Sequence, residues 1–586
     1  MLQNAKFKRL WAYITRRRRA QLGLLLVLVV VASLGEAISI GAVVPFLAVL
    51  LNPQKVFESE IAGPFIEILN INQSDELILP FTIIFVIASV LSGSLRILLL
   101  WAQTRIAHAI GADISYEIYR SALYRPYSTH ASRNTSEVIA GITSKADGVV
   151  MGVILPLLNL LSSTLIIIVI LTMLINIKPL VAISAFVCFG SIYWLIIFVA
   201  RHRLEINGRQ FSTLITKRIK ILHEGLGGIR HVILNSTQQT YTQMYRDVDL
   251  PLRYAIAANQ VISGSPRYGI EAVGITLIAI LAYTLVSNGE GFSSAIPALG
   301  ALAVGAQRML PVLQQGYSSL ANIKSYEAVL DDALEALEQP LPSYVNQKQP
   351  EPMSFKSAIS TKNLSFRYSP ETPWVLRDLN LQIKKGTRVG FIGITGSGKS
   401  TLLDILMGLL EPSEGQLLID NKVIDDKKRR AWRANVVHVP QDIFLADTTI
   451  SENIAFGIPY EKIDHNRVRE AADMAQIAKT IEGWKGQYEI IVGERGIRLS
   501  GGQRQRIAIA RALYKQTSVI FFDEATSALD NDTEYAVTNA INNIDKETTI
   551  LIVAHRLTSL SVCDLVIELE NGQVKRQGSY KQMIGE

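Results

Sequence analysis

Cysteine is scarce in this chain of 586 residues, which has only Cys188 and Cys563. Two cysteines so far apart support neither a disulfide framework nor a cysteine metal site, since both need several cysteines at characteristic spacings. Charged residues are also sparse, at 19%, and no nucleic-acid-binding motif accompanies the net charge of +7. These absences argue against a disulfide scaffold and against a nucleic-acid partner.

Apolar residues are abundant instead: they make up 49% of the chain and form long runs within roughly its first 320 residues. Each of six runs reaches the roughly 20 residues that a helix needs to cross the hydrocarbon core of a bilayer. The runs are 22–51, 79–103, 149–176, 179–200, 262–287 and 294–316. Residues 355–586 have the composition of a soluble α/β domain, and four prolines between 339 and 354 mark a linker. We therefore predict a polytopic α-helical membrane domain over residues 1–338, followed by the linker and the α/β domain.

Lysine and arginine are distributed unevenly between these runs. They number seven in residues 1–21, five in 104–148 and nine in 201–253, against one in 52–78 and one near 178. Because basic loops are retained in the cytosol, both termini and the α/β domain are predicted to be cytosolic. Four arginines before the first run also resemble the start of a signal peptide. The run exceeds the roughly 7–15 apolar residues of a signal core, which favours a retained span.

A phosphate-binding loop pattern, Gly-x-x-x-x-Gly-Lys-Ser, occupies residues 393–400. The pattern requires a strand before it and a helix after it, and residues 387–392 and 401–410 have the matching apolar character. Its glycines allow backbone N–H groups to turn inward on a polyphosphate. Lys399 is expected to reach the β- and γ-phosphates, and the Ser400 hydroxyl to bind Mg²⁺. The predicted nucleotide contacts here are Gly393, Thr395, Gly396, Ser397, Gly398, Lys399, Ser400 and Thr401.

Two carboxylates, Asp523 and Glu524, follow the apolar run 519–522, which is predicted to be a buried strand. Asp523 suits the oxygen shell of Mg²⁺. Neighbouring side chains of a strand point to opposite faces, so Glu524 is expected to polarise the water that attacks the γ-phosphate. His555 follows another predicted strand, 548–553, and is a candidate contact for that phosphate or water. A histidine alone would equally suit a surface or packing position.

Further motifs complete a resemblance to the ATP-binding cassette (ABC) transporter family that covers essentially the whole chain. Leu-Ser-Gly-Gly-Gln at 499–503 resembles the signature that closes on ATP bound by the opposite subunit. The resemblance implies that Tyr368 stacks on adenine, that Gln441 lies near Mg²⁺ in the catalytic site, and that 527–530 forms a loop across the dimer interface. Glu494 matches a loop that exporters of this family carry before the signature. The implied signature contacts are Ser500, Gly501, Gly502 and Gln503.

One chain carries one phosphate loop and one signature, so the resemblance implies a homodimer that binds two ATP molecules with Mg²⁺. Residues 104–148 and 201–261 resemble the intracellular helix extensions of type I exporters. Their tips, near 126–137 and 225–235, are expected to press on the nucleotide domains, with solvated loops as the alternative. The implied fold is thus an exporter-type membrane domain of six spans fused to a cytosolic α/β P-loop ATPase domain.

Charged side chains inside the apolar runs are the clue to the cargo. Glu36, Arg96, Arg267, Glu271 and Arg308 all lie within predicted spans, where a charge costs about 2.5–3.5 kcal/mol unless it is paired or hydrated. The three arginines are expected at similar depths, about 21–30 Å from the outer ends of their spans. Such a cationic layer suits a pyrophosphate head group, which guanidinium binds in a bidentate manner. Alternatively, the glutamates neutralise the arginines, or the arginines snorkel to the cytosolic boundary.

A narrower resemblance, to bacterial lipid-linked oligosaccharide flippases, lies in Gly35–Ile40, Pro266–Glu271 and Arg308–Pro311. It implies a lipid-linked glycan as cargo, the cytoplasmic membrane of a bacterium as location, and Arg96, Arg267, Arg308 and Glu36 as substrate contacts. Apolar residues at helical spacing over 57–69 predict an amphipathic helix on the outer membrane face, or else a packed loop. The alternative functions are export of another lipid, a drug or a peptide, and an ATP-gated channel or regulatory subunit.

Overall fold

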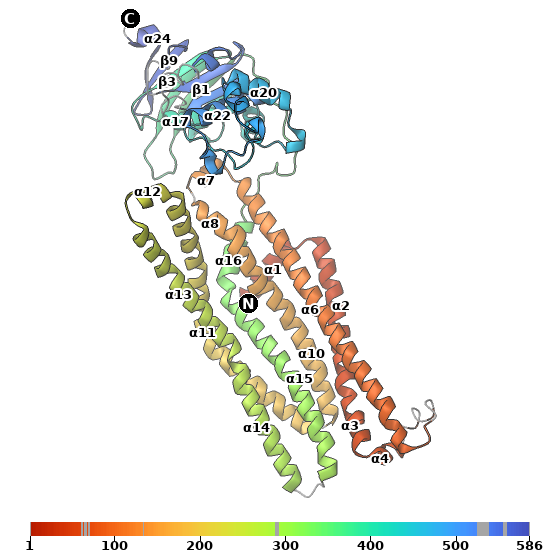
Figure 1. Ribbon diagram of the computed structural model, residues 1–586. Coiled ribbons are helices and arrows are strands. Elements are labelled where there is room, and N and C mark those ends of the chain that lie inside the picture. Colours follow the sequence, from red (N-terminus) through yellow and green to blue (C-terminus); the bar gives the residue numbers. More distant parts are fainter. Residues whose placement is uncertain are drawn as a thin grey trace. The chain divides into compact units, whose positions relative to one another are not determined.

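The computed structural model describes residues 2–584, except 60–62, 64–66, 68–70, 133, 178, 288–291, 524–537 and 555–559. Contacts divide the chain into two compact units. The first consists of Met1–Arg125 and Arg133–Pro342, and the second of Pro126–Ser132 and Ser343–Glu586. The first unit is helical, and the second combines two β-sheets with helices (Figure 1).

Long helices make up the first unit. They and their short neighbours are α1 (Leu2–Tyr13), α2 (Arg16–Gly41), α3 (Val43–Leu51), α4 (Pro53–Phe57), η1 (Ser74–Leu77), α6 (Ile78–Leu123), α8 (Thr135–Ala140), η2 (Gly141–Lys145), α9 (Ala146–Val149), η3 (Val150–Ile154), α10 (Leu155–Ile177), α11 (Pro179–Gly227), α12 (Ile229–Leu234), α13 (Gln238–Gly264), α14 (Pro266–Ser287), α15 (Phe292–Ser325) and α16 (Glu327–Leu337). Within the described residues, Arg16–Leu51, Ser74–Leu123 and Thr135–Met173 are long and apolar enough to cross a membrane. Of the other three predicted spans, 179–200 lies within α11, 262–287 covers the end of α13 and all of α14, and 294–316 lies within α15.

Two helices continue far beyond their apolar parts. Helix α6 has 46 residues and α11 has 49, so each is about 70 Å long, more than twice the thickness of a hydrocarbon core. The predicted intracellular stretches are therefore mostly extensions of spanning helices. Their two predicted tips contain short helices, α7 (Tyr127–Ser132) and α12. Four residues of the predicted outer amphipathic segment, Ile61, Phe65, Ile68 and Leu69, lie outside the described residues.

Proline explains two of the helix breaks. Helix α2 ends at Gly41, and Pro45 has no N–H group to donate to the Gly41 carbonyl, so the helix cannot continue through this turn. Pro266 begins α14, at the position where its missing donor costs nothing. The predicted first span thus consists of two helices, and the fifth begins within α13 and continues in α14.

A third break, between α15 and α16, is held by close packing around Tyr326. A side chain at Gly152 would place its Cβ 2.1 Å from the Tyr326 ring, so only glycine admits the ring there. A Cβ at Gly208 would lie 2.1 Å from the Ser325 carbonyl oxygen. Asn207 Nδ2 donates a hydrogen bond to Asn259 Oδ1 at 2.8 Å, and Asn259 Nδ2 donates one to the Ser325 hydroxyl at 2.5 Å. Two glycines and a polar chain therefore fix where α15 ends.

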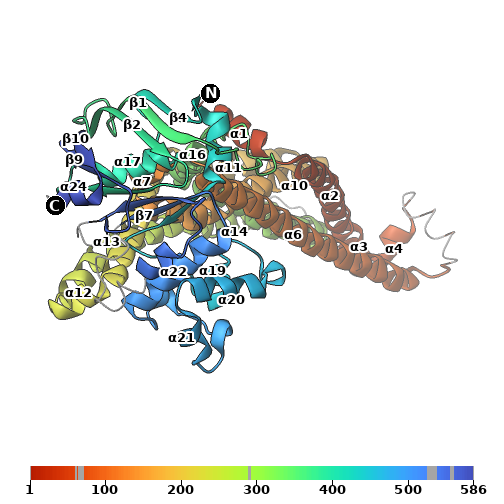
Figure 2. The same ribbon diagram turned by 90° about the horizontal axis from the view of Figure 1, so that it is seen from above.

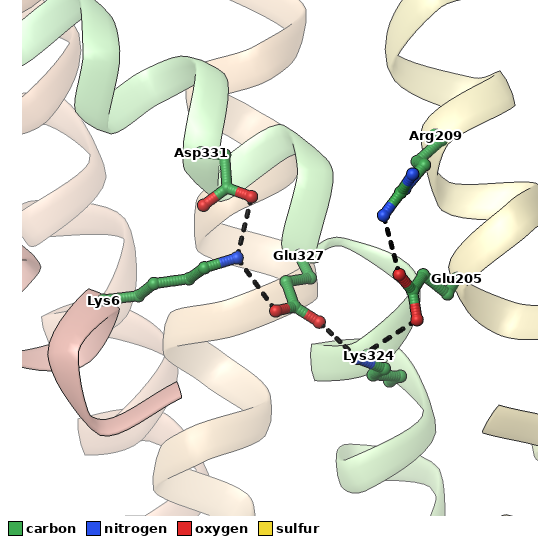
Figure 3. Close-up of polar contacts among 6 residues, drawn as sticks. All are labelled: Lys6, Glu205, Arg209, Lys324, Glu327 and Asp331. Carbon is green, nitrogen blue, oxygen red and sulfur yellow. Dashed lines mark hydrogen bonds and ion pairs between the residues drawn. The ribbon is translucent and has the colours of Figure 1, made fainter. Parts of the chain in front are cut away.

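Four helices of the first unit are joined by an ion-pair cluster (Figure 3). Lys6 of α1 lies 2.9 Å from Glu327 and 2.8 Å from Asp331, both on α16. Lys324 of α15 contacts Glu327 at 2.6 Å and Glu205 of α11 at 3.5 Å. Burial by itself would raise the pKa of Glu327, but the hydrogen bonds from Lys324 and Lys6 outweigh it and lower this pKa. The cluster fastens the N-terminal helix to the last helices of the unit.

The second unit contains α7 and the chain from residue 343 onward. Its remaining elements are β1 (Ala358–Phe366), β2 (Leu376–Lys384), β3 (Arg388–Ile392), α17 (Lys399–Leu406), β4 (Glu414–Ile419), β5 (Lys422–Val423), α18 (Asp426–Arg433), β6 (Val436–Val439), α19 (Ile450–Ile454), η4 (Tyr460–Lys462), α20 (His465–Met474), α21 (Ala478–Glu482), η5 (Gln487–Glu489), η6 (Glu494–Gly496), α22 (Gly501–Lys515), β7 (Val519–Asp523), β8 (Thr549–Val553), β9 (Leu565–Glu570), β10 (Gln573–Gly578) and α24 (Tyr580–Ile584).

Two sheets organise this unit. One is antiparallel, with strand order β2-β1-β4-β5, and the other has the order β10-β9-β3-β8-β7-β6. In the second sheet, β9, β3, β8, β7 and β6 run parallel to one another. The strands predicted over 387–392, 519–522 and 548–553 correspond to β3, β7 and β8.

The parallel strands are buried on both faces. Ile520 and Phe522 of β7 pack into the core beside α19 to α22, whereas Val519 and Phe521 pack into the core shared with β1, β2 and α17. This alternation follows from the two-residue period of a strand. Figure 2 shows α19, α20, α21 and α22 on one side of β7, and β1, β2 and β4 on the other. The carboxyl edge of the parallel strands is thus left to carry the predicted site.

Candidate nucleotide-binding site

The loop predicted to bind phosphate connects β3 to α17, and its backbone requires glycine at two positions. Gly393 has a φ of +150°, and a Cβ there would lie 2.3 Å from the Leu569 carbonyl oxygen. Gly398 has a φ of +96° and caps α17, where a Cβ would lie 2.6 Å from Leu376 Cδ2. The loop therefore passes tightly over its neighbours and ends at a helix N-terminus, where backbone N–H groups favour an anion.

Lys399 lies within this loop. Its side chain is buried, and Nζ donates to the carbonyl oxygens of Gly393 at 2.8 Å and Ile394 at 3.0 Å. Ser397 Oγ is buried without a hydrogen-bond partner among the described residues. Ser400, next to the lysine, is exposed. Two donors held inward and one exposed hydroxyl fit a loop that receives phosphate oxygens and a cation.

The other predicted catalytic positions follow the carboxyl ends of adjacent strands. Asp523 ends β7 and pairs in register with Val553 of β8, while Phe522 pairs with Val439 of β6. Gln441 follows β6 by two residues. Because β3, β8, β7 and β6 are parallel neighbours, the segments after them emerge at one edge of the sheet.

Glu524 and His555, which follow β7 and β8, lie outside the described residues, as do Ser527–Asp530. Their predicted roles therefore stay predictions. Within the described part of the chain, no group of three His, Cys, Asp or Glu side chains could hold a metal ion. A divalent cation at this edge would depend on Asp523 together with hydroxyl and amide oxygens, such as those of Ser400 and Gln441, and on the oxygens of the ligand, which suits Mg²⁺.

A carboxylate that the sequence analysis missed, Asp404 of α17, lies near Asp523. Burial, followed by the charge of Asp523, raises the pKa of Asp404 to about 6. Tyr127 of α7, in the same unit, has its pKa raised by burial and then by the charge of Asp404. The only sequence signal was an aspartate within the leucine-rich segment 401–410, whose apolar pattern predicts a helix and nothing more. Tyr127 lies in the predicted loop tip 126–137. The charge of Asp404 on α17, the helix that follows the phosphate loop, therefore acts on a side chain of this tip.

Tyr368 lies beside the same helix. Its hydroxyl is 3.1 Å from the hydroxyl of Thr401, and its ring packs edge-on against Phe366 with centroids 5.0 Å apart. The side chain is nevertheless 56% exposed. The Tyr368 side chain is therefore held by Thr401 and Phe366 while more than half of it stays exposed, an arrangement that suits stacking on a base.

The predicted signature forms the start of α22. Ser500 caps the helix, since its Oγ accepts from the Gln503 backbone N–H at 3.2 Å and the Gln503 side chain accepts from the Ser500 N–H at 2.8 Å. Ser500 and Gly501 are exposed, whereas Gly502 and Gln503 are half-buried. Glu494 lies in the preceding turn η6 and is also exposed. The signature is thus a helix N-terminus open to another molecule.

In the first unit, two of the four predicted cargo residues come together. Glu36 is completely buried, accepts a hydrogen bond from the Ser92 hydroxyl at 2.6 Å, and lies 3.7 Å from Arg96 Nε. The Arg96 side chain is 41% exposed. Arg267 is exposed on α14 and makes no ion pair within the described residues, and the side chain of Arg308 on α15 is not described. Neutralisation by glutamate thus applies to Arg96, whose guanidinium stays partly open.

Comparison with known proteins matches both units. The profile of the ABC transporter transmembrane region matches residues 22–293, and the profile described as ABC transporter matches residues 376–527. The chain is similar in fold to a bacterial Atm1-family ABC exporter solved with ATP bound. The TM-score is 0.77 at 21% identity, and the match covers 97% of this chain and 96% of the other.

Among curated relatives, an ATP-dependent lipid A-core flippase of Psychrobacter cryohalolentis is 31% identical over 422 residues, which cover 68% of this chain and 66% of the flippase. The alpha-hemolysin translocation ATP-binding protein of Proteus vulgaris is 41% identical over 231 residues, covering 39% and 32%. Across the curated relatives compared, the chain spans between 29% and 67% of their length. The two profiles together match more than half of the chain. The chain therefore belongs to the ABC transporter family, with an exporter-type membrane-spanning region fused to an ABC ATPase domain.

Proposed function

We propose that this chain, as a homodimer, hydrolyses ATP and uses the energy to move a lipid-linked oligosaccharide or a polysaccharide precursor across the cytoplasmic membrane of a bacterium. The observation that carries the ATPase part is the convergence of the phosphate loop, Asp523 and the segment with Gln441 at one edge of a parallel sheet. Both termini and the ATPase domain are assigned to the cytosol because the loops on that side hold most of the lysine and arginine.

Each residue has a definite task in this proposal. When bound, Mg²⁺–ATP supplies the γ-phosphoryl group whose transfer to water releases the energy. The loop amides and Lys399 hold phosphate oxygens, Ser400 and Asp523 hold the cation with Gln441 nearby, and Tyr368 supports the base. Glu524 accepts a proton from the attacking water, and His555 orients that water or the γ-phosphate.

The homodimer follows from the composition of one chain. It has one phosphate loop and one signature, and the signature forms an exposed helix N-terminus suited to an anion. A two-fold pair in which each signature closes on the opposite phosphate loop would complete two equivalent sites. Closure and hydrolysis would then drive the spanning helices through an export cycle.

The assignment of the cargo rests on Arg96 and its surroundings. Glu36, which accepts a hydrogen bond from Ser92, lies beside one side of the guanidinium, and the Arg96 side chain is partly open, so the site keeps a cationic hydrogen-bond donor within a predicted span. The flippase relatives are named for a lipid cargo, which supports an amphipathic anionic substrate. The toxin-translocation relatives match only 39% of this chain, which makes export of a polypeptide the weaker alternative.

The direct test uses purified protein in liposomes that contain a fluorescent undecaprenyl-pyrophosphate oligosaccharide. ATP should change the accessibility of the label to a membrane-impermeant quencher with the wild type, and should not with Glu524→Gln. If ATP is hydrolysed while this lipid stays in place, the cargo assignment is wrong and the ATPase assignment stands. If no ATP is hydrolysed, the catalytic assignment itself fails, which would favour a regulatory role.

A variant pair separates cargo binding from catalysis. Arg96→Gln should impair lipid movement more than basal ATP hydrolysis, because Arg96 belongs to the first unit and the catalytic residues to the second. Arg201→Gln is a matched control: this exposed arginine follows the predicted span 179–200 and stacks on Phe198 at 4.4 Å. Equal loss of transport and hydrolysis in Arg96→Gln would make Arg96 a structural residue.

A further inference from the structure

A groove of about 470 Å³ lies between the N-terminal part of α2 and the middle of α6. One end of its lining carries the guanidinium groups of Arg17, Arg18 and Arg105, and the other carries apolar side chains, among them Leu24, Leu28 and Trp101. We call it the basic groove. None of the nucleotide or cargo residues discussed above lines the basic groove. Its lining is cationic at one end and apolar at the other, which suits a ligand with both an anionic and an apolar part.

Two of the three arginines have unused charge. Arg18 donates to Asp113 at 2.9 and 3.3 Å and to Gln21 at 3.0 Å, so its charge is neutralised. Arg17 and Arg105 are exposed and form no ion pair with any residue that the structure describes. The Arg105 guanidinium lies 5.5 Å from the centroid of the Trp101 ring, which orients it beside the groove. The basic groove therefore offers the positive charges of Arg17 and Arg105 to a ligand, whereas the charge of Arg18 is paired with Asp113.

The apolar part of the groove continues in the direction of the predicted spans. Leu24 and Leu28 follow Arg17 by seven and eleven residues on α2, which corresponds to about 10–16 Å along the helix axis. Leu24 is 71% exposed and Trp101 is 58% exposed. A tryptophan at this level is typical of a membrane–water interface, where the ring lies among lipid head groups. The spacing fits a phosphate at the arginines and the first part of an acyl chain along the leucines.

We propose that the basic groove binds a membrane phospholipid with an anionic head group, in the leaflet on the side of the N-terminal end of α2. Arg17 and Arg105 contact the head-group phosphate, Arg18 is held by Asp113 as a fixed neighbour, and Leu24, Leu28 and Trp101 contact an acyl chain. Basic pockets between spanning helices recognise anionic lipids in this way. A free phosphate would leave the apolar wall exposed, and a zwitterionic lipid would bring a second positive charge toward the two arginines. The proposal is independent of the transported cargo.

The test uses the full-length protein in phosphatidylcholine liposomes that contain a small, equal fraction of brominated phosphatidylglycerol or brominated phosphatidylcholine. Bromine quenches tryptophan on contact, and the Trp101 signal is obtained by subtracting the spectrum of Trp101→Phe. We expect Trp101 to be quenched several times more strongly by the anionic lipid. Arg17→Gln and Arg105→Gln should each lower the preference for it about fivefold. Arg201→Gln, the exposed arginine outside the groove, should leave the preference unchanged.

Three outcomes would overturn the proposal. Equal quenching by both lipids, or an anionic preference that survives the Arg17→Gln, Arg105→Gln double variant, would remove the role of the arginines. Quenching by neither lipid would mean that protein, such as the second subunit, covers the groove. Displacement of the anionic lipid by millimolar inorganic phosphate would assign the groove to a free anion. Unchanged ATP hydrolysis and elution volume in each variant exclude misfolding as the cause of any loss.

Discussion

The two units position their charged groups in different ways. In the second unit, the backbone decides: parallel strands bring the phosphate loop, Asp523 and the segment with Gln441 to one edge, whatever their separation in the chain. In the first unit, side chains decide: Glu36 meets Arg96, and Lys6 meets Glu327, because of how particular helices are rotated against each other. Motif spacing in the sequence therefore predicts the site in the second unit, whereas the charged pairs in the first unit become visible only in the packed structure.

The largest effect should come from breaking the catalytic edge. Glu524→Gln keeps the shape of the side chain but cannot accept the proton of the attacking water, so ATP hydrolysis should fall by about 10²–10⁴-fold while nucleotide binding persists. Phosphate release and binding of a fluorescent ATP analogue, measured on the same sample, separate the two. Turnover at the wild-type rate would remove Glu524 from the catalytic site.

The next effect tests backbone contact in the first unit. Gly208→Ala would put a methyl group 2.1 Å from the Ser325 carbonyl oxygen, so we expect a loss of about 2–3 kcal/mol in stability, seen as a lower melting temperature in detergent. Gly93→Ala is the matched control on α6, because nothing lies within 4 Å of its Cβ. The control should be neutral or slightly stabilising through its better helix propensity. Equal melting temperatures for the two variants would contradict the close approach of α11 to Ser325.

A smaller effect concerns Asp404 in the second unit. Because its pKa is raised to about 6 from 3.8, the stability that protonation provides is complete below pH 3.8 and is lost as the pH rises through about 6. Asp404→Asn should therefore be more stable than the wild type at pH 7.5 in EDTA, by about 1 kcal/mol after allowance for partial exposure. The advantage should shrink toward pH 4. A difference that does not change with pH would mean that Asp404 is ionised in the folded protein throughout this range.

The smallest effect concerns Glu327 in the ion-pair cluster of the first unit. Glu327 has a pKa lowered from 4.5, so its stabilising contribution is present above pH 4.5 and is lost as the pH falls through its lower folded value. Glu327→Gln should cost about 0.5–1 kcal/mol at pH 7.5 and progressively less in acid. Arg209→Gln removes a 74%-exposed partner of Glu205 in the same cluster and should change stability by less than about 0.5 kcal/mol. If both variants melt alike at pH 7.5, burial adds nothing to these ion pairs.

The sequence predicted the second unit well for a physical reason. A phosphate loop needs glycine where φ is positive and where a neighbouring backbone comes close, and Gly393 and Gly398 meet both conditions. The strand over 387–392 was predicted to within one residue of β3, since buried parallel strands are short continuous apolar runs. The fold itself, a membrane-spanning exporter region fused to an ABC domain, is confirmed by the family profiles and the structural match. Asp404 was missed because a helical pattern does not indicate which of its polar residues is buried.

The sequence alone predicted the order of parts: a membrane half rich in apolar runs, a linker, and an ABC ATPase domain whose local motifs are expected to bind nucleotide through backbone conformation. Local motifs are sufficient there because the geometry of a loop depends on neighbouring residues in the chain. Only the tertiary structure decided that Glu36 lies beside Arg96, and that Arg17 and Arg105 border a groove without a carboxylate partner among the described residues. These features depend on the rotation of one helix against another, and near-uniform apolar runs leave that rotation undetermined until side chains pack.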